Sequence, residues 1–122
     1  MQIEVPNFYK NIIVTGGAGF IGGCLIRRLL KTTNSKIYNI DKCGYASDLA
    51  GINNEIKELR IQDSNRHILV KIDISNRKVL EEAILGIDPD LVIHLAAESH
   101  VDRSIAGPDA FISSNILGTY NL

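Results

Sequence analysis

A glycine-rich turn between a strand-like run and a helical stripe constrains the fold of this chain more than any other feature. The run at residues 11–15, Asn-Ile-Ile-Val-Thr, is short and β-branched, which is typical of a buried strand. Apolar residues then recur every four positions, which indicates a helix. The glycines of the turn are Gly16, Gly19 and Gly22, and the apolar positions of the helix are Ile21, Leu25 and Leu29.

Each glycine has a separate role in a turn that binds a dinucleotide. Gly16 permits the tight turn, Gly19 lets a diphosphate approach the backbone, and Gly22 lets the helix pack against the strand. The helix start offers N–H groups and the positive end of its dipole to phosphates. Asp41 follows the next strand at about the interval expected of an acid that binds ribose. The pattern therefore predicts dinucleotide binding.

Asp41 also bears on which dinucleotide is bound. A carboxylate accepts hydrogen bonds from the two ribose hydroxyls and repels a 2′-phosphate, so it favours NAD over NADP. Lys42 weakens this preference, because an ammonium group could pair with that phosphate, although a lone lysine is more often a solvated charge.

Alternating strand and helix patterns continue along the chain and predict an α/β fold. Strands are expected at 36–41, 67–72 and 91–95, with helices near Ile52, from an N-cap at Ser75 to an end at Gly86 and Pro89, and from Gly107 onward. Such alternation predicts a Rossmann-like, doubly wound parallel sheet of order 3-2-1-4. The sheet would normally continue, so we expect residues 1–122 to be the partial NAD-binding domain at the front of a larger protein.

Composition excludes several other classes of protein. The 122 residues suit one domain, and a net charge of −1 argues against nucleic-acid binding. No apolar stretch reaches the roughly 18 residues of a membrane span. Cys24 and Cys43 match no metal spacing, so we expect no metal site, two free thiols and a reducing, cytoplasmic location.

The polar run after the fourth expected strand lies where ligands bind in this architecture. Ser99, His100 and Asp102 could suggest a nucleophile system, but adjacent residues cannot form such a relay. Glu98 and Ser99 are instead expected to hold a ligand. Asp102 and Arg103 are expected to pair and to shape the loop.

Other residues allow a structural and a functional interpretation. Asp73 is either a turn residue or an acceptor for the adenine amino group, and Ala96-Ala97 either pack or make room for a cofactor. His94, inside an apolar strand, is expected to be a satisfied core histidine. Tyr38 and Lys42 have the spacing of a catalytic pair but lie on and after a strand, so the match is coincidental.

These motifs resemble the extended short-chain dehydrogenase/reductase superfamily. Residues 95–105, followed by Gly107-Pro108, Phe111, Asn115 and Gly118-Thr119, resemble the dTDP-glucose 4,6-dehydratase family in particular. The resemblance implies a lyase of nucleotide-sugar metabolism that converts dTDP-glucose to dTDP-4-keto-6-deoxyglucose and water through an internal NAD redox cycle. Another sugar-nucleotide epimerase or decarboxylase, and a non-catalytic NAD-binding remnant, remain alternatives.

The resemblance also assigns residues to the cofactor. By position, Phe20 and Ile21 would lie at the diphosphate, Asp41, Lys42, Cys43 and Gly44 at the adenosine ribose, Asp73 and Ile74 at the adenine, and Leu95, Ala96, Ala97, Glu98, Ser99 and Ser114 along NAD, with Ser99 also touching the sugar. The catalytic residues of the family lie beyond position 122, so none is assigned here. The helix with Phe111, Ile112, Ile116 and Tyr120 could face the sheet or a second copy in a homodimer.

Overall fold

Four parallel strands form one sheet at the centre of the protein, whose computed structural model describes residues 9–44, 47–58, 65–98 and 101–122. The order is β3-β2-β1-β4, which confirms the predicted Rossmann-like topology. β1 pairs with β2 from Asn11↔Lys36 to Thr15↔Ile40, and with β4 from Ile12↔Leu91 to Thr15↔His94. The strands are β1 (Asn11–Thr15), β2 (Lys36–Ile40), β3 (His67–Val70) and β4 (Leu91–His94).

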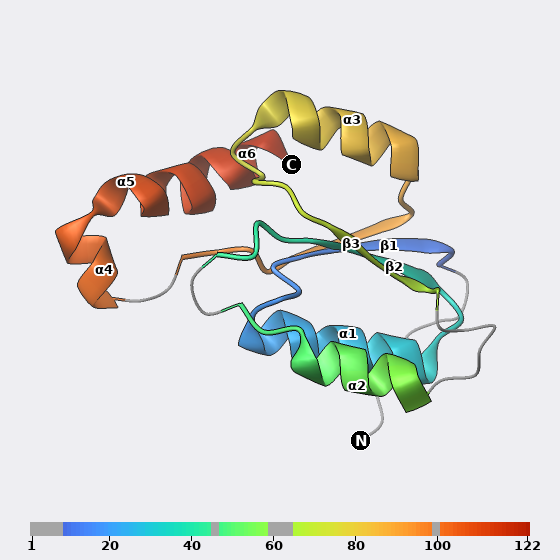
Figure 1. The fold of residues 1–122 in the computed structure, drawn as a ribbon. Helices are drawn as coiled ribbons and strands as arrows, with labels where there is room; N and C mark the ends of the chain where they lie inside the picture. The colour runs from blue at the N-terminus through green and yellow to red at the C-terminus, as the bar shows by residue number, and fades with distance from the viewer. Residues whose placement is uncertain (1–8, 45–46, 59–64, 99–100) are drawn as a thin grey trace, which may run out of the picture.

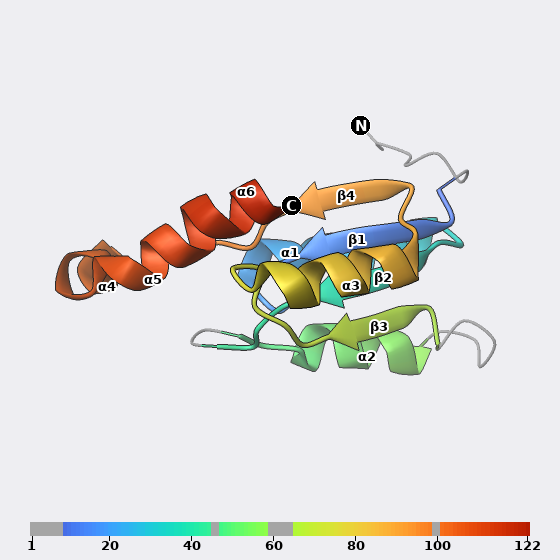
Figure 2. The ribbon, with the colours of Figure 1, turned by 90° about the horizontal axis from the view of Figure 1, so that it is seen from above.

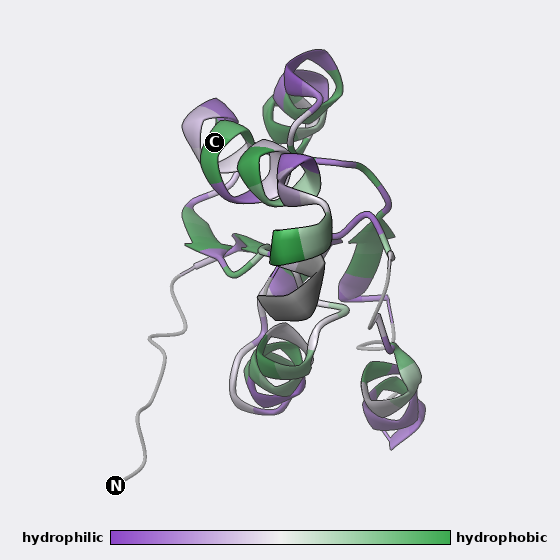
Figure 3. Ribbon diagram, turned by 90° about the vertical axis from the view of Figure 1, so that its left-hand side faces the viewer, coloured by the Kyte–Doolittle hydropathy of each residue, from purple (hydrophilic) through white to green (hydrophobic). Residues whose placement is uncertain are grey.

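Two helices cover one face of the sheet, as Figure 1 shows below the strands. They are α1 (Phe20–Thr32) and α2 (Ala50–Glu58), both close to their predicted positions. The strands carry hydrophobic residues between the helical layers, while α1 and α2 turn hydrophilic residues outward (Figure 3). The core on this side includes Ile12, Val14, Ile26, Leu29, Leu30, Ile37 and Ile52.

The opposite face is covered by α3 (Arg77–Ile87), which buries Leu80 and Ile87 as its sequence predicts. The predicted cap was wrong, because Oδ1 of Asn76, not Ser75, accepts the N–H of Val79 at 3.4 Å. The helix ends at Ile87, between the two residues predicted to end it, so Gly86 lies inside the helix and Pro89 beyond it. Asp88 follows the last helical residue in a left-handed conformation.

The C-terminal helical segments extend beyond the carboxyl ends of the strands, as Figure 2 shows. They are α4 (Val101–Ala106), α5 (Pro108–Phe111), the π-helix η2 (Ile112–Gly118) and α6 (Thr119–Asn121). The start at Gly107-Pro108 was predicted, whereas α4 was missed because its residues carry no apolar stripe. The π-helical stretch has no signature that a period-of-3.6 pattern can detect.

The long C-terminal segment turns apolar side chains toward solvent. Ile112, Ile116 and Tyr120 are 53%, 65% and 76% exposed, so of the two alternatives left open for this helix, packing of these side chains in the core is excluded. Ser114 and Gly118 are the buried residues of η2. A homodimer through the exposed side chains remains a prediction. Among the helices of the described ranges, none is long and apolar enough to cross a membrane.

Candidate functional site

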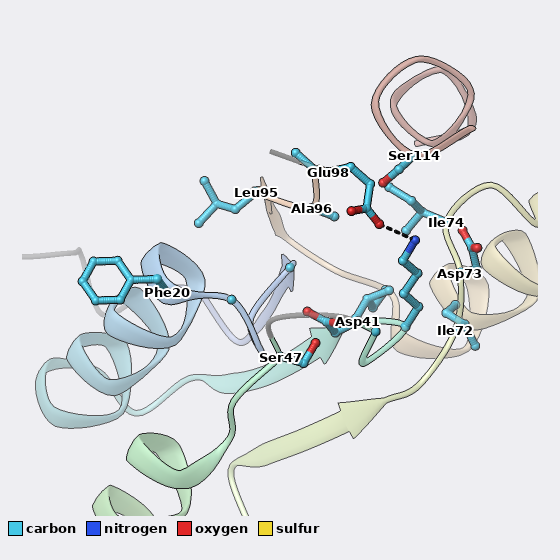
Figure 4. A pocket seen from close by; sticks show the side chains of 16 residues that line it. Phe20, Asp41, Ser47, Ile72, Asp73, Ile74, Leu95, Ala96, Glu98 and Ser114 are labelled. Atoms are coloured by element: carbon cyan, nitrogen blue, oxygen red, sulfur yellow. Dashed lines mark ion pairs between the residues drawn. The ribbon is translucent and has the colours of Figure 1, made fainter. Parts of the chain in front are cut away.

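A cavity of about 390 Å³ lies at the carboxyl ends of the strands, where the turn after β1 meets the segments after β2, β3 and β4 (Figure 4). This is the edge at which open α/β sheets bind ligands. The cavity is lined by Gly16, Gly19, Phe20, Ile40, Asp41, Lys42, Gly44, Ser47, Ile72, Asp73, Ile74, Leu95, Ala96, Ala97, Glu98 and Ser114.

The turn after β1 depends on Gly16, whose φ is +75°. Its N–H donates to the carbonyl of Ile40 at 2.9 Å, which ties the turn to β2. A Cβ at this position would lie 2.6 Å from the backbone nitrogen of Ala96. Glycine is therefore required both by the left-handed backbone and by the close approach of the chain after β4.

The start of α1 leaves open space on the cavity side. A Cβ on Gly22 would overlap the carbonyl oxygen of Gly16, whereas one on Gly19 would meet only that oxygen, at 3.3 Å. The first intrahelical bond runs from the N–H of Gly23 to the carbonyl of Gly19 at 2.9 Å, so the N–H groups of residues 20–22 precede it. Gly19 lacks a side-chain cap and lines the cavity, which leaves this helix end able to meet an anion.

Asp41 is held in place by two backbone N–H groups. Its Oδ2 accepts from Ala18 at 3.0 Å and its Oδ1 from Cys43 at 2.7 Å. Each carboxylate oxygen has a second acceptor site, so both can still bind a ligand hydroxyl. Cys43 reaches its bond with φ at +54°, and partial burial together with the nearby Asp41 raises the pKa of its thiol.

An ion pair spans the cavity above Asp41. Nζ of Lys42 lies 2.8 Å from Oε1 of Glu98, joining the segment after β2 to the segment after β4 (Figure 4). The backbone of Glu98 is itself fixed by Asn115 on η2. The Asn115 amide accepts the N–H of Glu98 at 2.8 Å and donates to its carbonyl at 3.0 Å.

Asp73 fulfils the turn role considered for it. Its Oδ1 accepts both the N–H and the hydroxyl of Ser75, at 2.9 and 2.8 Å. Burial acts to raise the pKa of Asp73, but the Ser75 bonds and the charge of Lys42 outweigh it and lower the pKa. Because the residue also lines the cavity, contact with a ligand remains compatible with the turn.

The π-helix brings its buried face against the apolar floor of the cavity. A Cβ on Gly118 would lie 2.5 Å from Cγ1 of Ile74, so the two elements touch at this glycine. Ser114, one turn earlier, is 7% exposed and lines the cavity. Widened π turns recur at functional sites because they realign side chains within a helix.

His94 is a satisfied histidine, as predicted, but it is only partly buried and not a core residue. Its Nδ1 lies 2.6 Å from the hydroxyl of Thr15, and its Nε2 lies 2.8 Å from the hydroxyl of Thr119. Burial lowers its pKa. Tyr38 lies on β2 and packs against the core, whereas Lys42 follows the strand and pairs with Glu98, so the two residues do not share a helix face.

The structure brings most of the predicted site residues together at this cavity. Ile21, Gly22 and Cys43 are close in sequence to lining residues but do not line it themselves. Ser99 and His100, and the side chains of Asp102 and Arg103, lie outside the described residues. The sequence analysis missed three lining residues, which are Ile40, Ser47 and Ile72. Two of them could have been found from the strand ends, because Ile40 is the last residue of β2 and Ile72 is the second residue after β3.

Comparison with known proteins finds a family and close relatives. The model of the family described as GDP-mannose 4,6 dehydratase matches residues 13–122. The chain is 46% identical to dTDP-glucose 4,6-dehydratase of Salmonella typhimurium over 111 residues, which cover 91% of this chain and 29% of the relative. It is 44% identical to the enzyme of Haemophilus influenzae, covering 92% and 31%. The chain thus spans about 30% of the length of these relatives.

Solved structures agree with the sequence relatives. A dTDP-glucose 4,6-dehydratase from Bacillus anthracis in complex with NAD superimposes with a TM-score of 0.67 at 34% identity, covering 92% of this chain and 32% of that one. A UDP-glucose 4-epimerase from Stenotrophomonas maltophila with bound NAD gives a TM-score of 0.76 at 26% identity, covering 93% and 32%. The fold is therefore that of the N-terminal third of these enzymes.

Proposed function

The chain belongs to the GDP-mannose 4,6-dehydratase family, and on that premise we propose that it forms the NAD-binding part of a dTDP-glucose 4,6-dehydratase. One observation supports this most strongly. The turn after β1, the carboxylate of Asp41 and the small residues Ala96-Ala97 meet around a single cavity at the carboxyl edge of the sheet. That arrangement suits an extended ligand with a diphosphate at its centre.

The residues present fit NAD at each part of the cofactor. The diphosphate lies at Gly19, Phe20 and Ile21, where the N–H groups of the first turn of α1 precede the helical bonds. The absence of a side chain at Gly19, which lines the cavity, supports this placement, since it lets a ligand approach the backbone of the turn. When bound, NAD supplies a hydride acceptor and donor for the sugar ring.

The adenosine half lies between the segments after β2 and β3. Asp41 accepts from the ribose hydroxyls, with Lys42, Cys43 and Gly44 along the same segment. The N–H of Cys43 donates to Oδ1 of Asp41 at 2.7 Å, which holds the carboxylate in its orientation toward the cavity. The adenine lies against the Asp73-Ile74 segment.

The nicotinamide half runs along the segment after β4 and under η2. Leu95, Ala96, Ala97 and Glu98 line this side of the cavity, and Ser114 presents its hydroxyl from the π-helix. Ser99 follows directly and is proposed to contact NAD and the sugar substrate. These residues bind and orient ligands, and none of them is proposed as an acid or base.

Cofactor binding is tested by calorimetric titration of the purified protein with NAD and with NADP. We expect NAD to bind and NADP to bind at least about tenfold more weakly, because a 2′-phosphate would face the carboxylate of Asp41. Asp41→Asn keeps the size of the side chain and removes its charge, so it should narrow that preference. No heat with either dinucleotide, or a preference for NADP, would contradict the proposal.

The substrate is tested separately, because the fold is shared with epimerases. The sequence identity of 46% to a dTDP-glucose 4,6-dehydratase favours the dehydratase. The superposition on a UDP-glucose 4-epimerase, with a TM-score of 0.76, keeps a sugar-nucleotide epimerase as the second candidate. dTDP-glucose and UDP-glucose are compared in turnover assays on a protein that contains this chain and the remaining length of its relatives. Residues 1–122 alone should bind NAD without turnover, which is also the behaviour of a non-catalytic NAD-binding module.

A further inference from the structure

We propose that Glu98 is a second determinant of cofactor selectivity, which acts by holding the ammonium group of Lys42 away from a 2′-phosphate. The inference rests on the proposed NAD-binding function. It assigns to a residue after β4 an effect on the ribose, which lies at the end of β2.

Lys42 is the charge that would otherwise favour NADP. It follows Asp41 directly, so its ammonium group could reach a phosphate on the ribose that Asp41 addresses. Its Nζ instead lies 2.8 Å from Oε1 of Glu98, and the two side chains are only 38% and 23% exposed (Figure 4). Partial burial of both partners makes this pair less screened than a surface ion pair.

Glu98 is fixed independently of Lys42. The Asn115 side chain accepts the N–H of Glu98 at 2.8 Å and donates to its carbonyl at 3.0 Å, which clamps the residue from both sides of its backbone. The backbone that carries the carboxylate is therefore held by η2, so only the side-chain torsions of the two partners have to be ordered when the pair forms.

The balance of charge around the cavity adds to the effect. Its charged lining residues in the described chain are Asp41, Asp73 and Glu98 against Lys42 alone. With Lys42 paired, a 2′-phosphate meets carboxylates without a counterion, whereas the uncharged hydroxyl of NAD does not. Without Glu98, the ammonium group could turn to the phosphate.

The experiment is a calorimetric comparison of wild type, Glu98→Gln and the double variant Glu98→Gln/Lys42→Met. Glutamine keeps the size of the side chain and the backbone clamp, and circular dichroism checks that each variant is folded. The measured quantity is the ratio of the Kd for NADP to the Kd for NAD. Glu81→Gln is the matched control, because it removes one carboxylate from an exposed ion pair on α3, outside the cavity.

We expect Glu98→Gln to lower this ratio about tenfold, and the double variant to return it to within about threefold of wild type. The control should leave it unchanged. An unchanged ratio in Glu98→Gln would overturn the inference. An equally lowered ratio in the double variant would also overturn it, since Glu98 would then act only by repelling the 2′-phosphate and not through Lys42. If wild type binds neither dinucleotide, the proposed function itself fails; if it binds NAD and only the ratio fails to move, that function stands.

Discussion

The hydroxyl oxygen of Thr15 lies 2.6 Å from Nδ1 of His94, which joins the end of the central strand to its neighbour. The same oxygen accepts the N–H groups of Leu95 and Ala96 at 3.0 and 3.1 Å, so its own proton goes to Nδ1. Thr119 donates its proton to the carbonyl of Asn115 and therefore accepts from Nε2. The network thus assigns a neutral His94 with the proton on Nε2.

This network predicts a loss of stability as the pH falls below about 6.5. Burial lowers the pKa of His94 from its ordinary value near 6.5, so the unfolded chain binds a proton before the folded one does. The contribution of His94 is fully present above pH 6.5 and is lost as the pH falls toward its folded pKa. Thermal unfolding between pH 8 and pH 5 should show a falling Tm, and His94→Gln should make that fall smaller.

A second histidine, His67, also contributes to the fall of Tm between pH 8 and pH 5. Burial lowers its pKa as well, so His67→Gln should make this fall smaller by an amount that is separate from the effect of His94→Gln. Asp73 and Asp90 have lowered pKa values too, but their contributions are lost only below about pH 4. A slope between pH 8 and 5 that is identical in wild type and in both histidine variants would refute the assignment.

Alanine substitutions at the three glycines of the turn should affect the stability of the protein and the binding of NAD to different degrees. Gly22→Ala places a Cβ onto the carbonyl of Gly16, and Gly16→Ala adds a strained φ to a backbone overlap, so each should cost about 2–4 kcal/mol of unfolding free energy. Gly19→Ala meets only one oxygen at 3.3 Å and should cost less than about 1 kcal/mol. It should nevertheless weaken NAD binding, because Gly19 lines the cavity and an added methyl group would hinder the approach of the diphosphate to the backbone.

Urea denaturation and NAD titration of the three variants check this division. The informative result is the order of the variants in each measurement. If Gly19→Ala bound NAD as wild type does, the diphosphate would not lie at this turn. Equal loss of stability in Gly19→Ala and Gly22→Ala would contradict the difference between their Cβ contacts.

The packing of η2 against the floor of the cavity, at Gly118 and Ile74, can be tested by a double-mutant cycle. Gly118→Ala would bring a Cβ within 2.5 Å of Cγ1 and 2.6 Å of Cδ1 of Ile74, so it should cost about 1–3 kcal/mol by overpacking. In an Ile74→Ala background the space is empty, and the same change should be neutral or stabilising by up to about 1 kcal/mol, because alanine favours a helix over glycine. Additive unfolding free energies in the double-mutant cycle would rule out the contact.

Sequence patterns predicted the sheet because its strands are buried and its turn has a chemical signature. The run at residues 11–15, the glycines and Asp41 each report one local requirement, and together they locate the cavity edge. The Ser75 cap failed because Asp73 competes for the Ser75 hydroxyl and N–H, leaving Asn76 to cap the helix.

Contacts between side chains that are far apart in the sequence could not be predicted from sequence patterns. Lys42 and Glu98 meet only because β2 and β4 end at the same edge, on either side of β1. Likewise, nothing local to Asn115 indicates that its amide clamps the backbone of Glu98. Helix η2 turns Ile112 and Ile116 outward, a choice between the sheet and solvent that apolar character alone left open.

A buried arginine closes the connection between α1 and β2, and its removal should be costly. Arg66 donates through Nη1 to the carbonyls of Thr33 and Ser35, at 3.0 and 3.1 Å, and through Nη2 to the carbonyl of Leu30 at 2.8 Å. Its guanidinium thus satisfies acceptors at the C-terminal end of α1, where positive charge is favourable. Arg66→Met leaves these carbonyls without their donors and should lower the unfolding free energy by about 3–5 kcal/mol.

Arg66→Lys should recover only part of this loss, because one ammonium group cannot reproduce the planar fork of the guanidinium. The matched control is Arg77→Met, which breaks an exposed ion pair with Glu81 and should leave the unfolding free energy almost unchanged. Urea denaturation with a constant m-value measures all three variants. An Arg66→Met variant within 1 kcal/mol of wild type would show that water replaces the arginine at these carbonyls, and that α1 ends where it does for reasons other than this side chain.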